Sequence, residues 1–357
     1  MASLAALAAL LATGPAASAT EAGGGEAIPD GGSPAAVSAL SQNWTGPWSL
    51  SFLPDGDSAL ATERHTYRVF RLHRDGRKTQ VGKVPHTVAG PARPHGNGGL
   101  LGVAPSPTWN GTTDKRVYFM HTTQTDTRVV RMDYDGATLS GYTTLVGGIQ
   151  RGGDHNGGKI AFGPDGYLYV ATGDGRVPAL AQDKNSLNGK ILRITASGAP
   201  APGNPFGTRV FSYGHRNPQG LAWDRNGRLW TAEIGEDTYD ELNLIKPGAN
   251  YGWPTCEGPC GTAGMTGPKA VWKPEEGVPA QLAVVRNVLY VATLRGQRLW
   301  RVPINGDTDA VGAKTAFYPG TYGRLRAVAK VPGADALWLG SDRREVGKDV
   351  VLEVTIK

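Results

Sequence analysis

The chain has 357 residues, enough for one large or two ordinary domains, and its net charge at pH 7 is +6. It holds 51 Gly and 25 Pro with 39% hydrophobic residues, a mixture that favours many short strands and turns over long helices. The basic residues are scattered, without the Lys/Arg runs of nucleic-acid-binding tails, so we expect no nucleic-acid partner. An anionic small ligand would explain the charge, and so would a basic surface without a specific ligand.

The chain begins with an apolar stretch of signal-peptide length. It ends in Ala17-Ser18-Ala19, a small-residue cleavage pattern before Thr20, and it is too short to span a bilayer. The positively charged start of a signal peptide is missing, which fits a truncated or misassigned start. We predict a signal peptide over residues 1–19, export to the extracellular space, a flexible lead-in over residues 20–43 and no membrane-spanning segment.

From Trp44 onward the sequence repeats a loose unit of strand, Gly-containing turn and second strand. Copies recur at intervals of roughly 45 to 60 residues, the period of a four-stranded propeller blade. The pattern predicts an all-β, six-bladed β-propeller with four-stranded antiparallel blades over residues 44–357; a β-sandwich with long loops is the competing fold. The copies are Leu50–Ala61, Val103–Phe119, Ile160–Ala171, Leu221–Ala232, Leu282–Ala292 and Val328–Gly340.

The loops between these copies carry the candidate chemistry, because the loops of a propeller converge at one end of its central channel. A Gly-rich loop places Asn97 among glycines that let backbone approach a ligand. Further along, Asp154 and His155 precede a predicted hairpin that ends near Asp174. If the hairpin returns the chain, Asp174 lies near His155, and a carboxylate behind a His fixes its tautomer and raises its basicity. An Asp and a His on a surface turn remain the alternative.

Two later loops are rich in charge. Arg216 and Asn217 stand on a turn before a repeat strand, and Arg is a bidentate donor suited to a carboxylate or a quinone oxygen. Arg324 and Arg326 are spaced to share one face of a strand. Facing a channel they would bind an anion; facing solvent they would be ordinary surface arginines.

An acidic stretch over residues 232–254 offers carboxylates and turn carbonyls, the hard oxygen ligands that Ca²⁺ prefers, although a solvated acidic loop would look the same. The two cysteines of the chain, Cys256 and Cys260, follow it directly. In an exported protein such a pair closes a small disulfide loop, and we prefer this to a metal site because no His or second Cys pair lies nearby.

Taken together, these motifs resemble the soluble, PQQ-dependent glucose/sorbosone dehydrogenases, especially the bacterial aldose sugar dehydrogenase branch. The resemblance runs from about Trp44 to Lys357 and rests on GGLLG, DHNGGKIAFGPDGYLYVATGD, SLNGKILRI, YGHRNPQGLAWD, DELNLIKPGANYGWP and GRLRAV, in that order. It implies a six-bladed propeller that oxidises aldoses at the anomeric carbon to lactones, with PQQ and calcium as cofactors and an external electron acceptor. A monomer or a homodimer would both fit.

The resemblance also implies roles for individual residues. Catalysis falls to the general base His155, the carboxylate Asp174 that orients it, and Arg216 beside the quinone. The other implied contacts are to PQQ by Asn217, Arg295, Arg324, Arg326 and Asp342, to the sugar by Asn97, Asp154 and Trp272, to the active-site calcium by the backbone carbonyls of Gly235 and Glu236, and to a second, structural calcium by Glu241 and Tyr251.

The sequence departs from the family pattern at several of these positions. Asn97 replaces the usual Gln, Arg295 the usual Lys and Glu236 the usual Pro. Trp272 would fit a blade core as well as a pocket wall. A calcium-dependent, lactonase-like propeller without a quinone, and a non-catalytic sugar- or protein-binding propeller, are the alternative functions; the arginines disfavour the first, and His155 with Asp174 disfavours the second.

Overall fold

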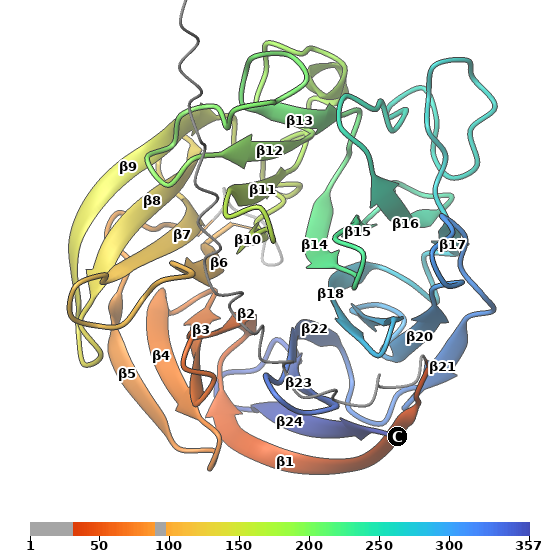
Figure 1. Cartoon of the computed structure of the whole chain (residues 1–357). Helices are drawn as coiled ribbons and strands as arrows, with labels where there is room; N and C mark the ends of the chain where they lie inside the picture. Colours follow the sequence, from red (N-terminus) through yellow and green to blue (C-terminus); the bar gives the residue numbers. More distant parts are fainter. Residues whose placement is uncertain (1–30, 90–97) are drawn as a thin grey trace, which may run out of the picture.

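The structure is a computed structural model that describes residues 31–89 and 98–357. Its strands form six four-stranded antiparallel sheets, which stand as blades around a central axis (Figure 1). The predicted six-bladed propeller is therefore confirmed. Within the described residues the regular helical structure is a single 3₁₀ turn, η1 (Pro178–Ala181), and no helix there has the length and apolar character needed to cross a bilayer.

Blades 1 to 3 follow one another in chain order, each with its first strand nearest the axis. Their strands are β2 (Pro47–Phe52), β3 (Ser58–Glu63), β4 (Arg68–His73) and β5 (Lys78–Lys83) in blade 1, β6 (Leu100–Pro105), β7 (Arg116–Thr122), β8 (Thr127–Tyr134) and β9 (Leu139–Ile149) in blade 2, and β10 (Ile160–Phe162), β11 (Leu168–Thr172), β12 (Lys190–Ile194) and β13 (Val210–Tyr213) in blade 3.

Blades 4 and 5 repeat this order, whereas blade 6 takes its outermost strand from the start of the chain. Their strands are β14 (Pro218–Trp223), β15 (Leu229–Glu233), β16 (Asp240–Ile245) and β17 (Ala270–Trp272) in blade 4, β18 (Pro279–Val285), β19 (Val288–Thr293), β20 (Leu299–Pro303) and β21 (Thr315–Phe317) in blade 5, and β22 (Leu325–Lys330), β23 (Ala336–Ser341), β24 (Asp349–Ile356) and β1 (Pro34–Trp44) in blade 6.

Each repeat copy found in the sequence corresponds to the inner hairpin of one blade. The first strands of neighbouring blades lie side by side around the axis, as β14 and β18 do. The hydrophobic core is divided among the interfaces between blades, each of which holds its own buried cluster. The blades are thus held together by apolar contacts between sheet faces, and within each blade by antiparallel hydrogen bonds.

Strand β1 corrects the predicted lead-in over residues 20–43. Residues 20–30 lie outside the described residues, but Pro34–Trp44 forms an 11-residue strand that pairs with β24 in antiparallel register, Val37 opposite Val354 and Ala39 opposite Leu352. Figure 1 shows β1 and β24 running together along the rim beside the C-terminus. The propeller therefore begins ten residues before Trp44, and the two ends of the chain close the ring within one blade. The predicted signal peptide, residues 1–19, also lies outside the described residues.

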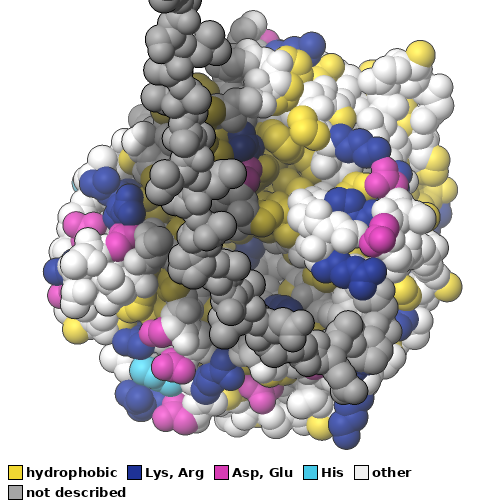
Figure 2. All heavy atoms as spheres, in the orientation of Figure 1, with side chains coloured by type: hydrophobic (Ala, Val, Ile, Leu, Met, Phe, Trp, Pro, Cys, Tyr) yellow, Lys and Arg dark blue, Asp and Glu magenta, His cyan; other side chains and the backbone are white. Residues whose placement is uncertain are grey.

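Acidic and basic side chains are interspersed over the face of the molecule shown in Figure 2. This distribution fits the scattered charge of the sequence. The loops that carry the candidate residues lie where first strands begin and second strands end, because antiparallel neighbours place those positions at the same end of each blade. His155 precedes β10 and Asp174 follows β11 at that end, as the hairpin prediction requires.

We predict that Trp44→Ala lowers the free energy of unfolding by about 3–5 kcal/mol, the range for truncating a large buried aromatic side chain. Trp44 is 0% exposed, packs edge-on against Phe70 at 5.3 Å between ring centroids, and lies in the cluster between blades 6 and 1. Chemical denaturation measures the change. Gln42→Ala, at an exposed position of the same strand, is the control and should change stability by less than about 0.5 kcal/mol. Equal effects of the two substitutions would contradict a role for β1 in holding the ring closed.

Candidate active site

A cavity of about 320 Å³ lies at the loop end of the inner strands. It draws its walls from loops of blades 3 to 6, so residues far apart in the sequence share one pocket. Eight of the predicted site residues line it. Its lining residues are Asp154, His155, Arg216, Asn217, Ile234, Gly235, Glu236, Val278, Leu294, Arg295, Arg324 and Arg344.

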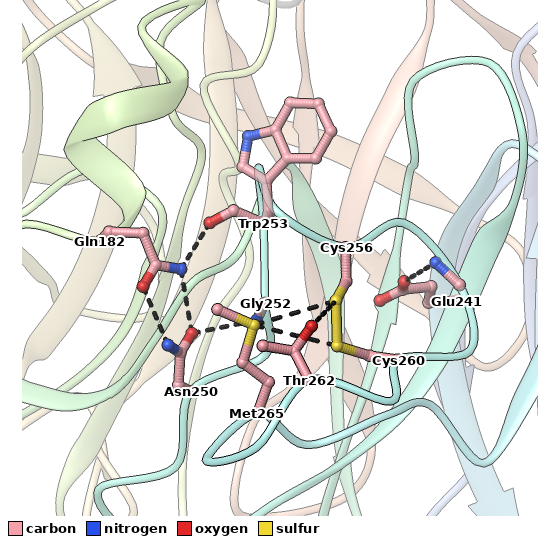
Figure 3. Close-up of a disulfide and its surroundings, with 10 residues drawn as sticks. Gln182, Glu241, Asn250, Gly252, Trp253, Cys256, Cys260, Thr262 and Met265 are labelled. Carbon is pink, nitrogen blue, oxygen red and sulfur yellow. Dashed lines mark hydrogen bonds between the residues drawn. A yellow bond between two sulfur atoms is a disulfide. The ribbon is translucent and has the colours of Figure 1, made fainter.

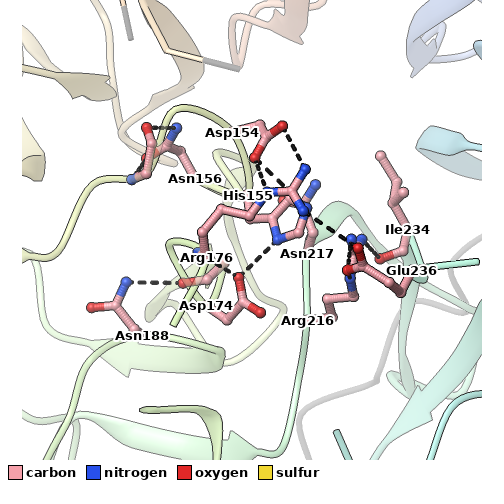
Figure 4. Close-up of polar contacts among 12 residues, drawn as sticks. Asp154, His155, Asn156, Asp174, Arg176, Asn188, Arg216, Asn217, Ile234 and Glu236 are labelled. Atoms are coloured by element: carbon pink, nitrogen blue, oxygen red, sulfur yellow. Dashed lines mark hydrogen bonds and ion pairs between the residues drawn. The ribbon is translucent and has the colours of Figure 1, made fainter. Parts of the chain in front are cut away.

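His155 and Asp174 form a buried hydrogen-bonded pair on the wall of this cavity. His155 Nδ1 lies 2.8 Å from Asp174 Oδ1, and the two residues are 4% and 0% exposed (Figure 4). An ionised carboxylate only accepts hydrogen bonds, so Nδ1 carries the proton and Nε2 is left as a base. The nearest carboxylate to Nε2 is that of Asp154, with Oδ1 at 3.8 Å, too long for a hydrogen bond.

The local backbone is built to bring these two residues together. His155 has a φ of 56°, a left-handed conformation that a residue with a Cβ seldom adopts. Gly173, just before Asp174, has no Cβ, and one built there would lie 1.9 Å from the His155 carbonyl oxygen. The amide of Asp174 donates to the carbonyl of Arg216 at 2.8 Å, which fixes the pair against blade 4. The predicted approach of Asp174 to His155 is therefore confirmed.

The guanidinium group of Arg216 contacts the acidic loop that follows β15. Its Nε donates to Glu236 Oε2 at 2.7 Å, and its Nη1 donates to the carbonyl of Ile234 at 3.1 Å and to that of Gly235 (Figure 4). Arg176 forms an ion pair with Asp154 and lies 3.4 Å from Glu236 Oε1. Of the two carbonyls predicted to bind the active-site calcium, that of Gly235 thus already contacts a cation.

Arginines from blades 1 and 6 surround the buried carboxylate of Asp342. Arg326 Nε donates to Asp342 Oδ2 at 2.7 Å, and Arg324 Nη2 lies 3.9 Å from the same oxygen. Burial would raise the pKa of Asp342, but Arg326 and Arg64 hold it well below its usual range. Burial, reinforced by repulsion from Arg326, lowers the pKa of Arg64 to about 9, and burial lowers that of Arg324 to about 10. Burial and mutual repulsion both disfavour these charges, so an acidic ligand would stabilise them.

Gln219 adds a polar atom beside these arginines. Its Oε1 accepts a hydrogen bond from Arg326 Nη1 at 3.0 Å, and its side chain is buried. Its Nε2 has no hydrogen-bond partner in the described part of the chain. A buried amide donor without a partner, next to excess positive charge, is suited to an oxygen-rich anionic ligand.

The sequence prediction missed Arg64 and Gln219, although the repeat held a signal for Arg64. Arg64 follows β3 directly, just as Asp342 follows β23 and Arg295 comes two residues after β19. Residues at the end of the second strand of a blade therefore recur in the site. Gln219 carries no such signal, because a polar residue inside an inner strand is not distinguished by spacing.

Two predicted sugar contacts have different outcomes. Trp272 is 1% exposed on β17, the outermost strand of blade 4, and packs with Trp300 in the core between blades 4 and 5. Its prediction as a wall of the sugar pocket is wrong, because the fourth strand of a blade lies far from the axis. Asn97 lies outside the described residues.

The predicted disulfide between Cys256 and Cys260 is present (Figure 3). Glu257 lies inside the loop that the disulfide closes. Its Oε1 accepts hydrogen bonds from the backbone N–H groups of residues 236, 237, 238 and 239, at 2.7 to 3.2 Å. The disulfide loop therefore orders the loop between β15 and β16 that carries Gly235 and Glu236.

Glu241 and Tyr251, predicted for a second calcium, line one very small space with Glu233 and Glu257. Burial and the neighbouring Glu233 raise the pKa of Glu241 to about 8. The Tyr251 hydroxyl donates a hydrogen bond to the carbonyl of Leu244 at 2.6 Å, so this hydroxyl already has a protein partner. Within residues 31–89 and 98–357, no group of three or more His, Cys, Asp or Glu side chains is arranged to hold a metal ion.

Comparison with known proteins gives one consistent result. Residues 44–348 match the Glucose / Sorbosone dehydrogenase family. The PQQ-bound aldose sugar dehydrogenase of Streptomyces coelicolor is 44% identical, with a TM-score of 0.86 over 93% of this chain and 100% of that one. An aldose sugar dehydrogenase of Escherichia coli is 32% identical over 61% of this chain and 61% of its own length. Quinoprotein glucose dehydrogenase B of Acinetobacter calcoaceticus is 32% identical over 60% of this chain. The match spans about half the length of that last relative, 52%.

We predict that Glu257→Ala increases amide hydrogen exchange of residues 236–239 at least about tenfold, because hydrogen bonds to a charged acceptor contribute about 1.5–3 kcal/mol. Exchange followed by mass spectrometry or NMR measures this. Asp237→Ala is the control, since its exposed side chain belongs to the same loop. Unchanged exchange in Glu257→Ala would show that the disulfide loop does not order this segment.

Proposed function

This chain belongs to the glucose/sorbosone dehydrogenase family, and we propose that it oxidises aldose sugars at the anomeric carbon to lactones with PQQ and calcium. The electrons would pass to an external acceptor. The observation that carries the proposal is the shared cavity: a His base oriented by a buried carboxylate faces the same space as Arg324, one of the arginines around Asp342.

PQQ fits the residues around the cavity. The cofactor carries three carboxylates. Arg324 lines the cavity, Arg64 lies with it around Asp342, and burial disfavours the charge of both; among the described residues, Gln219 Nε2 nearby has no hydrogen-bond partner. Arg324, Arg326 and Arg295 would hold the carboxylates, while Asp342 orients Arg326 from behind. Arg216 and Asn217 line the same cavity toward blade 4, where the reactive end of the cofactor would meet His155.

The hydrogen-bonded pair of His155 and Asp174 then determines what the chain's own residues do in the reaction. His155 Nε2 takes the proton of the anomeric hydroxyl, and Asp174 stabilises the imidazolium that forms. When bound, PQQ supplies the quinone that accepts the hydride from the anomeric carbon, which leaves a lactone. Asp154 and its partner Arg176 stand at the open side of His155, where they would contact the other sugar hydroxyls.

Calcium fits the donor chemistry of the acidic loop. The Gly235 carbonyl and the Glu236 carboxylate and carbonyl are hard oxygen ligands of the kind that calcium prefers. Arg216 now contacts the Gly235 carbonyl and the Glu236 carboxylate, so calcium binding would require the guanidinium group to move away from them. Bound calcium would supply Lewis-acid polarisation of the quinone.

The disulfide between Cys256 and Cys260 is consistent with the predicted export, because such bonds persist in oxidising compartments.

Reconstitution tests the whole proposal. Protein is incubated with PQQ, with Ca²⁺ or with both, and dye reduction is followed with glucose and a panel of aldoses. Activity that requires both additions supports the proposal. If the protein does not bind PQQ, the cofactor assignment is refuted, and a lactonase-like or non-catalytic propeller becomes the favoured function.

We predict that His155→Ala leaves PQQ binding largely intact and lowers kcat at least about 10²-fold, the usual contribution of a positioned general base. Absorbance titration with PQQ and steady-state dye reduction measure the two effects separately. His73→Ala, on β4 in blade 1, is the control and should leave kcat unchanged. Unchanged turnover in PQQ-loaded His155→Ala protein would remove His155 from the mechanism.

We predict that Arg324→Gln weakens PQQ binding about 10- to 100-fold, because a charge-assisted hydrogen bond contributes about 1.5–3 kcal/mol. Equilibrium titration of the cofactor measures the affinity. Arg343→Gln is the matched control: Arg343 lines a neighbouring cavity with Arg324 but does not line the candidate active site. If the two variants lose affinity equally, the effect is one of general surface charge and the proposed contact is wrong.

A further inference from the structure

The second carboxylate oxygen of Asp174 has a donor of its own. Oδ1 accepts hydrogen bonds from His155 Nδ1 at 2.8 Å and from the Arg176 backbone N–H at 2.9 Å. Oδ2 accepts one from the indole Nε1 of Trp253 at 2.9 Å. Trp253 lies in the loop after β16 of blade 4, whereas Asp174 follows β11 of blade 3. The indole therefore reaches across a blade interface to the carboxylate that orients the predicted base.

The backbone of Trp253 is held firmly in place. Its N–H donates a hydrogen bond to the carbonyl of Gly214 at 3.0 Å, and its carbonyl accepts one from Gln182 Nε2 at 2.6 Å. The Gln182 amide also exchanges two hydrogen bonds with the side chain of Asn250, at 3.0 and 2.8 Å (Figure 3). Gln182 directly follows η1 in blade 3, so this amide pair joins the two blades beside the indole.

We propose that Trp253 is a positioning residue for the His155–Asp174 pair. By donating to Oδ2, the indole fixes the rotation of the carboxylate, so that Oδ1 faces the imidazole. It also draws part of the negative charge of Asp174 away from His155, because a hydrogen bond to a carboxylate stabilises its charged form. Without this donor, Asp174 would stabilise the imidazolium more strongly, and His155 would keep its proton to higher pH.

The other charges that face His155 do not depend on the indole nitrogen. Asp154 lies 3.8 Å from Nε2 and is paired with Arg176, and Arg216 lines the same cavity. The Arg216 guanidinium carbon lies 5.4 Å from the centroid of the Trp253 ring. Phe at position 253 keeps an aromatic ring for Arg216 and removes only the hydrogen-bond donor, so a change in the proton uptake of His155 would report the Oδ2 contact.

The test compares Trp253→Phe with Trp338→Phe. Trp338 Nε1 donates to Glu353 Oε2 at 2.9 Å in blade 6, which gives the control the same kind of indole–carboxylate contact away from the site. In the PQQ- and calcium-loaded enzyme, we expect Trp253→Phe to move the acid limb of the pH–rate profile up by about 0.5–1 pH unit, since one unit corresponds to about 1.4 kcal/mol, the size of one hydrogen bond. At the pH optimum, kcat should fall about three- to tenfold with little change in KM. Trp338→Phe should leave the profile in place.

The inference rests on the proposed function for its kinetic readout alone. NMR titration of the His155 ring in protein without cofactor measures the same upward shift independently of turnover. If wild-type protein shows no PQQ-dependent activity but the ring titration shifts in Trp253→Phe, the proposed function fails and the positioning role stands. Identical titrations of wild-type and Trp253→Phe protein overturn the positioning role.

A second variant covers the case in which Trp253→Phe does not fold. Gln182→Leu leaves the indole intact and removes the side-chain amide that holds the Trp253 carbonyl. It should move the ring titration in the same direction by a smaller amount. No shift in Gln182→Leu, with a normal unfolding transition, would then overturn the proposal.

Discussion

The antiparallel pairing of β1 with β24 is the constraint on which the rest of the structure depends. Each blade packs its apolar faces against two neighbours, so the cores between blades form a ring that is complete only when blade 6 contains a strand from each end of the chain. The chain runs from β1 of blade 6 directly into β2 of blade 1, so this pairing also holds those two blades together. Arg64, after β3 of blade 1, meets Arg326 and Asp342 of blade 6 across that junction. An open ring would separate these charges, so the strand pairing at the rim also assembles part of the pocket at the axis.

The pocket divides into two halves with different chemistry. Blades 3 and 4 supply the hydrogen-bonded pair of His155 and Asp174, for which we propose proton transfer, and the acidic segment around Gly235. Blades 5 and 6 supply Arg295, Arg324 and Arg344 to the lining, and Arg64 of blade 1 adds its charge beside Asp342. This separation keeps Asp174 and Asp342 apart, each committed to its own partner. A substitution in the first half should therefore act mainly on turnover, and one in the second half mainly on ligand affinity.

The sequence predicted those features that depend on local periodicity. The inner hairpins were recognisable because each has two apolar strands around a turn, which contains Gly in five of the six, and the approach of Asp174 to His155 follows from one such hairpin. Features that depend on distant pairing were not predictable. The segment that forms β1 was predicted as part of a flexible lead-in because its partner strand lies about 300 residues later. Trp272 was misassigned because spacing does not tell the fourth strand of a blade from a loop at the axis, and Trp253 reaches Asp174 only across a blade interface.

Glu236 shows how a departure from the family pattern fits the charge balance of the site. Its carboxylate accepts hydrogen bonds from Arg216 and lies near Arg176, so it neutralises cations that would otherwise repel one another at the mouth of the cavity. Around Asp342, by contrast, one carboxylate faces Arg64, Arg324 and Arg326, and the pKa of Arg64 still falls to about 9. Positive charge is thus compensated beside His155 and stays in excess around Asp342. An acidic ligand that binds the folded state there stabilises it by mass action, which links the stability of the propeller to occupancy of its site.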